Sequence, residues 1–257
     1  MKLILQTAGS QEIRRLLAHA ITHDIRTVRA SAATLINQED NLEECAIPVG
    51  SVEFVREAMR VTGISEPTPI NYPSSLRSFL HREMQCLPKD RLPNGNWFLK
   101  PAGKTKLFDG FVNVFDDETD VGERSFRKEQ REAFDRLPST TPVFVSEIVN
   151  FVSEWRYYIL KDKIVGAARY DDGDDDAPIP SEKTVKAMLS AYKKDDKTRP
   201  VAFGLDVGVL KSGETALVEV NDAWSLGLYQ DMTDTAAYLE MLSRRWNQVM
   251  GNKPRAE

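Results

Sequence analysis

Three side chains that carry oxygen ligands occur near the C-terminal end of the sequence. Asp206 lies in the stretch FGLDVGVL, and Glu219 and Asn221 lie in the next apolar stretch, ALVEVN. The turn-forming residues 211–214 separate the two stretches, which predicts a β-hairpin. The simplest register of that hairpin places Asp206 directly across from Glu219. The alternation of side chains along a strand then puts Asn221 on the same face.

Two carboxylates that face each other favour a bound cation. They repel each other, and burying an unpaired charge is costly. Mg²⁺ takes oxygen ligands and usually shares one or two carboxylates with the phosphates of a substrate. Asp206, Glu219 and Asn221 are therefore candidate ligands of Mg²⁺, or of Mn²⁺ in its place. Two alternatives stay open: the strand ends at an exposed edge in water, or a one-residue shift in register separates Asp206 from the other two.

Cationic side chains upstream could hold phosphates for such a metal. Lys100 ends the predicted strand NWFLK, and the loop that follows contains Lys104 and Lys106 together with Gly103 and Gly110. Backbone N–H groups and lysines of such a loop can bind a polyphosphate. The spacing is not that of a P-loop, and a solvated surface is the alternative for these lysines.

Two arginines occupy the arms of another predicted hairpin, SEWRYYILKDKIVGAARY. Arg156 precedes its turn and Arg169 follows it. Depending on whether the turn has two or three residues, the arginines face the same side or opposite sides, and the sequence leaves both arrangements open. Arginines that point inward from a largely apolar hairpin need anionic partners. A structural salt bridge from Glu154 is the alternative to a substrate anion.

Periodicity and capping predict the elements that position these residues. In the first third, a strand at residues 3–6 alternates with helices that begin after Ser10 and Ser51, which is typical of a small α/β lobe. A further helix is expected from Ser74 to about Met84. Turn-forming residues crowd the stretch 87–96 and indicate a lobe boundary. Later helices are expected among strands at residues 125–137, 181–194 and 233–250.

Composition excludes several classes of protein. The chain has 257 residues, of which 41% are hydrophobic and 28% charged, and its net charge is −5, so we expect a globular protein that does not bind nucleic acid broadly. It has no apolar stretch of membrane length and no signal-peptide core, so we expect a cytoplasmic protein without a membrane partner. Cys45 and Cys86 lack metal-site spacing, and His19 and His23 are expected to be solvated on a helix.

The ordered segments from Trp97 to Tyr229 resemble the ATP-grasp ligases. WFLKP looks like the strand whose lysine contacts the phosphates of ATP, which points to Lys100. VFVSEIV is similar to the segment that reads adenine through backbone groups. The residues that the resemblance assigns to the adenine are Glu147, Ile148 and Val149.

The two hairpins carry the rest of this resemblance. SEWRYYILKDKIVGAARY resembles the stretch of glutathione synthetase and the ribosomal-protein glutamate ligases in which an acid and an arginine precede a turn and a second arginine follows it. FGLDVGVL and ALVEVN look like the magnesium signature of the family. The resemblance assigns Glu154 to the nucleotide, Arg156 and Arg169 to catalysis, and Asp206, Glu219 and Asn221 to the metal. IPVGSVEFV, FVSEWR and EVNDAWSLGLY narrow the likeness to a divergent branch found in bacteria and phages, whose substrates are largely unassigned.

This resemblance implies the α+β ATP-grasp fold, in which two α+β lobes hold ATP, preceded by a small N-terminal α/β lobe. We expect residues 1–90 to form the N-terminal lobe, 91–150 the small lobe, and 151–257 the large lobe with the metal site.

The implied reaction joins a carboxylate to an amine. The γ-phosphoryl group of ATP passes to the carboxylate with Mg²⁺, and the amine attacks the acylphosphate to give an amide, ADP and phosphate. The substrates are expected to be small molecules or peptides, and the sequence does not identify them or the oligomeric state. Two alternatives remain: a phosphotransferase that releases the phosphorylated substrate, and a nucleotide-binding module without catalysis.

The sequence departs from the family pattern in three places. The loop after Lys100 has fewer glycines than usual. The upstream lysine of the family has no clear counterpart, and Arg77, Arg82 or Lys89 could replace it. The metal-site strand continues into residues 222–224, DAW, where small residues are more usual, which suggests an altered acceptor site. Arg77, Arg82, Trp224 and Tyr229 could line that site, or serve only packing and the surface.

Overall fold

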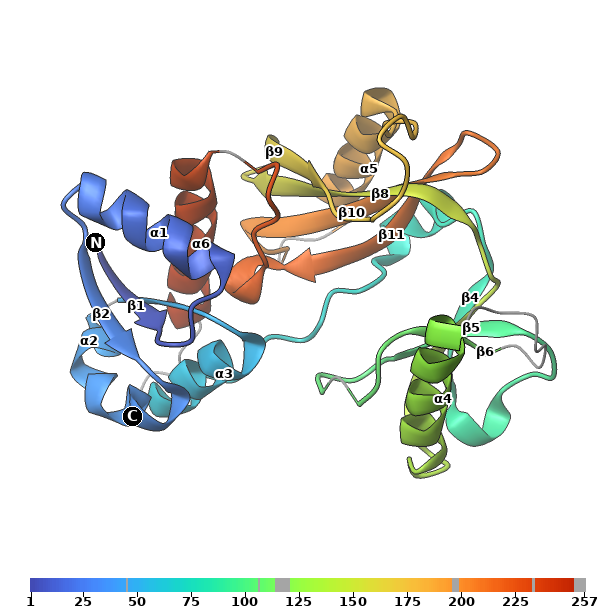
Figure 1. Ribbon diagram of the computed structural model, residues 1–257, viewed down its shortest axis with the longest axis horizontal. Coiled ribbons are helices and arrows are strands. Elements are labelled where there is room, and N and C mark those ends of the chain that lie inside the picture. Colours follow the sequence, from blue (N-terminus) through green and yellow to red (C-terminus); the bar gives the residue numbers. More distant parts are fainter. Residues whose placement is uncertain (45, 106, 114–120, 196–198, 233, 252–257) are drawn as a thin grey trace. The chain divides into compact units, whose positions relative to one another are not determined.

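The computed structural model describes residues 1–257 except 45, 106, 114–120, 196–198, 233 and 252–257, and it leaves out the side chains of 121–124 and 195 (Figure 1). Contacts divide the chain into two compact units. One unit contains Met1–Phe79 and Val152–Glu257, and the other contains Leu80–Phe151. The expected division into three lobes at residues 90 and 150 stays a prediction. Each unit is described by itself below.

The N-terminal part of the first unit is a small parallel α/β layer. Its three strands follow the order β2-β1-β3. The predicted N-caps are confirmed, since the Ser10 hydroxyl accepts from the N–H of Ile13 at 3.2 Å and the Ser51 hydroxyl accepts from that of Phe54 at 3.3 Å. The elements are β1 (Lys2–Gln6), α1 (Gln11–Thr22), β2 (Arg26–Ala30), α2 (Glu39–Glu43), β3 (Ile47–Val49) and α3 (Val52–Val61), with a 3-10 helix at Ala32–Gln38.

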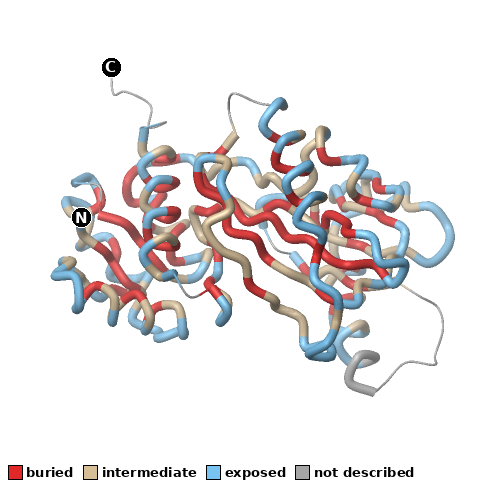
Figure 2. The backbone as a smooth tube through the Cα atoms, turned by 90° about the horizontal axis from the view of Figure 1, so that it is seen from above, coloured by how far each residue is buried: buried red, intermediate tan, exposed pale blue. Residues whose placement is uncertain are grey.

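The second sheet of this unit contains both predicted hairpins. Its strand order is β11-β10-β8-β9. The central strand β10 is buried along its whole length, and Figure 2 shows buried residues concentrated on the strands. The elements are β8 (Phe151–Leu160), β9 (Lys163–Arg169), α5 (Glu182–Asp195), β10 (Ala202–Leu210), β11 (Thr215–Asp222) and α6 (Thr235–Gly251), with a 3-10 helix at Ala223–Ser225.

Helices lie on opposite faces of this sheet. On one face, Tyr192 of α5 meets Phe203 of β10 edge-on, with ring centroids 5.1 Å apart. On the other face, Tyr238 of α6 meets Tyr158 of β8 edge-on at 6.1 Å. Because side chains alternate along a strand, Asp206 lies on the face opposite Phe203. The candidate metal ligands therefore share a face with Tyr158 and α6.

The hairpin of β10 and β11 confirms the predicted pairing of Asp206 with Glu219. Near the turn the register differs from the simplest one, because Val209 pairs with Thr215 and Val207 pairs with Leu217. An irregularity between Asp206 and Val207 then restores the expected pairing. Two deviations thus cancel before the strand reaches the site.

The hairpin of β8 and β9 places its two arginines on opposite faces. Its turn has two residues, Lys161 and Asp162, both with positive φ, which would put Arg156 and Arg169 on one face. A register shift after Tyr158 moves the pairing by one residue, so that Arg156 faces Ala168 and Arg169 faces Trp155. The bulge decides the question that the sequence left open.

The second unit is a four-stranded sheet of order β4-β7-β5-β6 with one helix, α4 (Val121–Asp135). Its core lies on one face, where Leu99 and Val145 pack with Phe134 of α4. The predicted helix from Ser74 to Met84 is wrong beyond a 3-10 helix at Ser74–Phe79, because Met84 begins a strand that pairs with Ser146 of β7. The strands are β4 (Met84–Pro88), β5 (Trp97–Pro101), β6 (Phe111–Asn113) and β7 (Pro142–Ser146).

Candidate functional site

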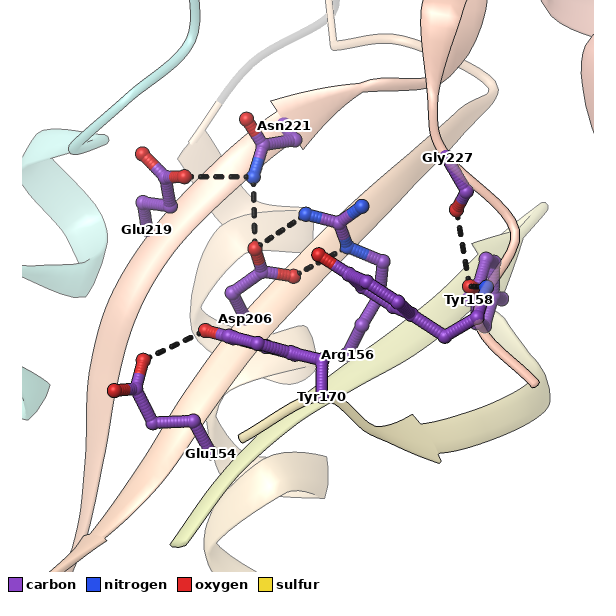
Figure 3. Close-up of polar contacts among 9 residues, drawn as sticks. Glu154, Arg156, Tyr158, Tyr170, Asp206, Glu219, Asn221 and Gly227 are labelled. Atoms are coloured by element: carbon purple, nitrogen blue, oxygen red, sulfur yellow. Dashed lines mark hydrogen bonds and ion pairs between the residues drawn. The ribbon is translucent and has the colours of Figure 1, made fainter. Parts of the chain in front are cut away.

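The three candidate metal ligands lie together on the sheet of the first unit (Figure 3). The Nδ2 of Asn221 donates to Oδ2 of Asp206 at 2.9 Å and to Oε1 of Glu219 at 3.0 Å. Asp206 is buried, with 2% of its surface exposed, whereas Glu219 and Asn221 are half-buried. One deep carboxylate thus lies beside two side chains that reach the surface.

Arg156 of β8 holds the deep carboxylate. Its Nε donates to Oδ1 of Asp206 at 2.8 Å and its Nη2 donates to Oδ2 at 2.6 Å, a two-pronged ion pair (Figure 3). Gly204 of β10 leaves room for the guanidinium, since a Cβ there would lie 3.4 Å from the Nε of Arg156 and 2.8 Å from a methyl group of Leu226. Arg156 is therefore next to the candidate metal ligands, but its fork is directed at Asp206.

Burial raises the pKa of two carboxyl groups in this cluster. Burial raises the pKa of Asp206, while the hydrogen bond and charge of Arg156 oppose that shift. Burial also raises the pKa of Glu154, a hydrogen bond from Tyr170 opposes the shift, and the charges of nearby carboxylates, including Asp206 and Glu219, add to it. The charges of Asp206 and Glu219 thus reach Glu154, and that of Glu219 reaches Asp206.

The donor set fits a magnesium ion. Carboxylate and amide oxygens are hard ligands, and turning the Asn221 amide would present its oxygen where Nδ2 now lies. Among the described residues, no group of three or more His, Cys, Asp or Glu side chains could hold a metal by itself. A metal at Asp206, Glu219 and Asn221 therefore needs further oxygen ligands, such as phosphates and water.

Two stacked tyrosines border the cluster. The rings of Tyr170 and Tyr229 lie parallel with centroids 5.0 Å apart, and the Arg156 guanidinium lies 4.9 Å from the Tyr229 centroid. The Tyr170 hydroxyl donates to Oε2 of Glu154 at 2.8 Å. The sequence analysis gave Tyr170 no role, and its hydroxyl accounts for how Glu154 is held.

Arg169 is not part of this cluster. Its Nε and Nη2 donate to Asp171 at 2.8 and 2.6 Å, and its Nη1 donates to the carbonyl of Asp174 at 2.7 Å. The Arg169 guanidinium, through its hydrogen bond, lowers the pKa of Asp171 well below its usual range. The arginine fastens the acidic loop that follows β9.

Asp222, the residue after the candidate ligands, also has a structural partner. Its carboxylate receives two hydrogen bonds of 2.6 Å from Arg245 of α6, and both side chains are buried. Its Oδ1 also accepts from the N–H of Trp224 at 3.2 Å. The departure from small residues at this position is thus explained by a tie between β11 and α6, which sequence reasoning missed.

The candidate phosphate-binding lysines belong to the second unit. Lys100 lies on β5 across from Phe144, and Leu99 before it points into the core, so the Lys100 side chain is on the other face of the sheet. Lys104 is exposed in the following loop, and Lys106 lies outside the described residues. Lys89 donates to the carbonyls of Asp135 and Leu137 at 2.7 and 2.9 Å, so it caps α4.

The candidate adenine segment follows β7 in the same unit. The backbone N–H of Glu147 donates to the carbonyl of Glu83 at 3.1 Å, and its carboxylate accepts from the N–H of Glu83 at 2.9 Å. Ile148 is exposed and Val149 is half-buried. Glu147 therefore ties this segment to the residue that precedes β4.

In the part of the chain that the structure describes, no helix is both long and apolar enough to cross a membrane.

Comparisons with known proteins identify the fold. The family model "ATP-grasp domain, R2K clade family 2" matches residues 77–241. No curated protein matches the chain. D-alanine–D-alanine ligase from Bacillus anthracis is similar with a TM-score of 0.53 at 16% identity, covering 99% of this chain and 100% of its own.

Two further structures agree. D-cycloserine synthetase DcsG has a TM-score of 0.53 at 12% identity, covering 96% of this chain and 100% of its own. A RimK domain ATP-grasp protein from Sphaerobacter thermophilus has a TM-score of 0.51 at 10% identity, covering 98% and 100%. At such low identities these likenesses show the fold alone, and they confirm the expected α+β ATP-grasp architecture. Since the family model spans more than half of the sequence, this chain belongs to R2K clade family 2 of the ATP-grasp domains.

Proposed function

We propose that this protein is an ATP-dependent ligase that joins a carboxylate to an amine. The observation that carries the proposal is the cluster of Asp206, Glu219 and Asn221 on one face of a buried hairpin, joined by hydrogen bonds from the Asn221 amide. The family supports an ATP-dependent reaction, and solved ATP-grasp structures include a D-alanine–D-alanine ligase and a D-cycloserine synthetase. Small molecules or peptides are therefore the substrate classes to test.

The proposed reaction has two steps. An oxygen of the substrate carboxylate attacks the γ-phosphorus of ATP, the bond from that phosphorus to the β–γ bridging oxygen breaks, and ADP leaves. The amine nitrogen then attacks the carbonyl carbon of the acylphosphate, and phosphate leaves as the nitrogen loses a proton. No nucleophilic side chain is needed, so the protein acts by positioning and by neutralising charge.

The cluster would hold the metal that this reaction requires. Asp206, Glu219 and Asn221 supply its oxygen ligands. A metal ion held there, Mg²⁺ or Mn²⁺, would supply positive charge for the phosphate oxygens. Arg156 orients Asp206 through its two hydrogen bonds and opposes the rise of its pKa on burial, which is a more specific role than general neutralisation of phosphate.

Residues of the second unit would bind the nucleotide. We propose that Lys100, with Lys104 or Lys106, contacts the phosphates, and that backbone groups of Glu147, Ile148 and Val149 contact the adenine. For Glu154 we retain a nucleotide-side role that depends on its hydrogen bond from Tyr170. The ion pair of Arg169 with Asp171 favours a role in holding the acidic loop, and a direct catalytic role is not part of the proposal.

A screen for ADP release tests the function. The purified chain is incubated with ATP, Mg²⁺ and pooled amino acids, peptides or cell extract, and products are identified by mass spectrometry. We expect an amide together with ADP and phosphate. A phosphorylated product without an amide would select a phosphotransferase, and bound ATP that is never converted would select a nucleotide-binding module.

Glu219→Gln tests the metal assignment within the same screen. The substitution keeps the size of the side chain but removes one of the ligand charges, so Mg²⁺-dependent ADP formation should fall at least about 100-fold. Glu214→Gln, in the exposed turn of the same hairpin, is the matched control and should keep the activity. Full turnover by Glu219→Gln would overturn the assignment.

A further inference from the structure

The segment Leu226–Met232, the 226–232 loop, brings an aromatic ring to the candidate site. It follows the 3-10 helix after β11 and precedes α6. Its Tyr229 stacks on Tyr170 and lies against the Arg156 guanidinium, which in turn holds Asp206. The position of this loop therefore bears on the position of a candidate metal ligand.

Apolar side chains fasten the two ends of the 226–232 loop. Met232 is buried and occupies the space above Gly166 of β9, where a Cβ would lie 2.0 Å from the Met232 sulfur. Leu226 is buried over Gly204 of β10. In both contacts the side chain fills the space left over a glycine of the sheet, so the two ends of the loop are fixed by packing.

Hydrogen bonds from the sheet hold the middle of the loop. The Tyr158 hydroxyl donates to the carbonyl of Gly227 at 3.0 Å (Figure 3). It also accepts from the N–H of Tyr229 at 2.9 Å. One hydroxyl thus uses both its donor and its acceptor capacity on the loop. The backbone N–H of Tyr229 is satisfied, but its carbonyl points elsewhere.

Arg15 of the N-terminal helix α1 contacts three carbonyls of the 226–232 loop. Nη1 of Arg15 lies 3.4 Å from the carbonyl oxygens of both Tyr229 and Gln230, and Nη2 contacts the carbonyl of Met232 and lies 3.3 Å from the hydroxyl of Thr235. A planar guanidinium can donate to several acceptors at once, which a lysine ammonium does with less directional precision. Arg15 is half-buried, so these contacts are partly shielded from water.

We propose that Arg15 is a positioning residue for the ligase reaction, acting through the backbone of the 226–232 loop. It fixes the carbonyl of Tyr229 and that of Gln230 after it, and so keeps the Tyr229 ring against Arg156 and the Arg156–Asp206 pair. The inference rests on the proposed function for its catalytic consequence, but the ordering of the loop can be measured without catalysis. Arg15 itself touches no reacting atom.

Removal of Arg15 should loosen the loop and leave the fold intact. The side chains of Leu226 and Met232 pack over Gly204 and Gly166 without Arg15, so they still fix the ends of the loop, although the carbonyl of Met232 loses its contact with Nη2. The carbonyls of Tyr229 and Gln230 would be left to water, and the segment between the packed ends would sample more conformations. Arg15→Lys keeps the charge but loses the fork, so its effect should be intermediate.

Matched variants test the inference. Arg14 precedes Arg15 on α1 and is exposed, so Arg14→Ala removes the same kind of side chain from the same helix turn. Hydrogen exchange of the loop amides should be about 10-fold faster in Arg15→Ala, equivalent to ~1.4 kcal/mol of local opening, and unchanged in Arg14→Ala. Amides of β10 should exchange as in the unmodified protein in every variant, which shows that the fold is retained.

Kinetics supply the second measurement. For Arg15→Ala we expect kcat to fall by about 10- to 100-fold, as for a reacting group displaced by a fraction of an ångström to an ångström, with the KM for ATP nearly unchanged. Arg15→Lys should recover part of kcat. Unchanged loop exchange in Arg15→Ala, or an equal loss in Arg14→Ala, would overturn the inference.

The two proposals fail in different ways. If the unmodified chain releases no ADP with any substrate pool, the proposed function fails, while the exchange data still decide whether Arg15 orders the loop. If the chain is active and Arg15→Ala loosens the loop without lowering kcat, Arg15 is a structural residue and the positioning role is wrong.

Discussion

At the scale of the residue, partners decide what a charged side chain does. Two arginines, Arg156 and Arg169, lie on the two strands of one hairpin. Arg156 forms an ion pair with the buried Asp206, whereas Arg169 forms one with Asp171 in a loop. The sequence could show that inward arginines need anions. It could not show which anions, because a one-residue bulge sets the face and the partner of Arg156 is 50 positions away.

Glu12 of α1 predicts a pH-dependent stability. Burial raises its pKa from 4.5 to about 7, and a hydrogen bond from the Tyr238 hydroxyl opposes the shift. That hydroxyl also contacts the carbonyl of Leu226, so a single phenol proton faces two acceptors when Glu12 is ionised. Two ionisable groups of β8, Arg156 and Tyr158, also act on Tyr238 through their charges.

The sign of the pH effect follows from the direction of the shift. The folded protein binds the Glu12 proton more tightly than the unfolded chain, so its stability should fall as pH rises from about 4.5 through 7. In Glu12→Gln the loss of stability between pH 4 and pH 8 should be smaller by about 2–3 kcal/mol. The variant should therefore be more stable than the unmodified protein at pH 8 but not at pH 4. Urea unfolding at both pH values measures this difference. A variant equally destabilised at both pH values would contradict the titration of Glu12.

At the scale of the element, the hairpin of β10 and β11 shows what a sequence pattern can predict. The pairing of Asp206 with Glu219 is as predicted, although Val209 pairs with Thr215 and the register near the turn differs. The pairing was expected from the position of the turn, whereas β10 is buried along its whole length, so alternation of apolar and polar residues does not specify its register. The turn residues do not specify the exact pairing beside them, so the compensating irregularity was not foreseeable. The helix predicted at residues 74–84 failed for a related reason, since pairing with β7 outweighed local helical pattern.

The ion pair that joins β11 to α6 predicts how the stability of the protein depends on Asp222. Asp222 and Arg245 form a buried, two-pronged ion pair. Asp222→Ala should destabilise the protein by about 3–5 kcal/mol, because it leaves the Arg245 guanidinium buried without its counter-charge. Thermal or urea unfolding measures the loss.

A double variant distinguishes the contribution of the ion pair from the cost of burying an unpaired charge. Asp222→Leu combined with Arg245→Met replaces both partners by apolar side chains, so it should recover most of the stability that Asp222→Ala loses. Arg244→Ala, an exposed neighbour on α6, is the control and should change stability by less than about 0.5 kcal/mol. A double variant as unstable as Asp222→Ala would mean that Asp222 supports the fold mainly through its hydrogen bond to Trp224.

At the scale of the whole molecule, the family could be predicted from the sequence, but the contacts of the N-terminal helix α1 with the loop beside the site could not. The order of lysine, adenine segment, paired arginines and metal signature pointed to the ATP-grasp fold, which the family model confirms. The N-terminal helix α1 gave no such signal, yet Arg15 reaches carbonyls 214 and more positions along the chain. Contacts to backbone carbonyls leave no pattern in side-chain types, so they become visible only in three dimensions.

Ligand-linked stability tests the metal cluster in the intact chain without a known substrate. A ligand that binds only the folded state raises stability by RT ln(1 + [L]/Kd), which is about 2.7 kcal/mol at a concentration of 100 Kd. If Asp206, Glu219 and Asn221 hold Mg²⁺ together with the phosphates of ATP, MgATP should raise the melting temperature more than ATP and Mg²⁺ raise it separately. Glu219→Gln should lose this excess and keep the rise caused by ATP alone, whereas Glu214→Gln should keep both. An undiminished excess in Glu219→Gln would place the metal elsewhere in the chain.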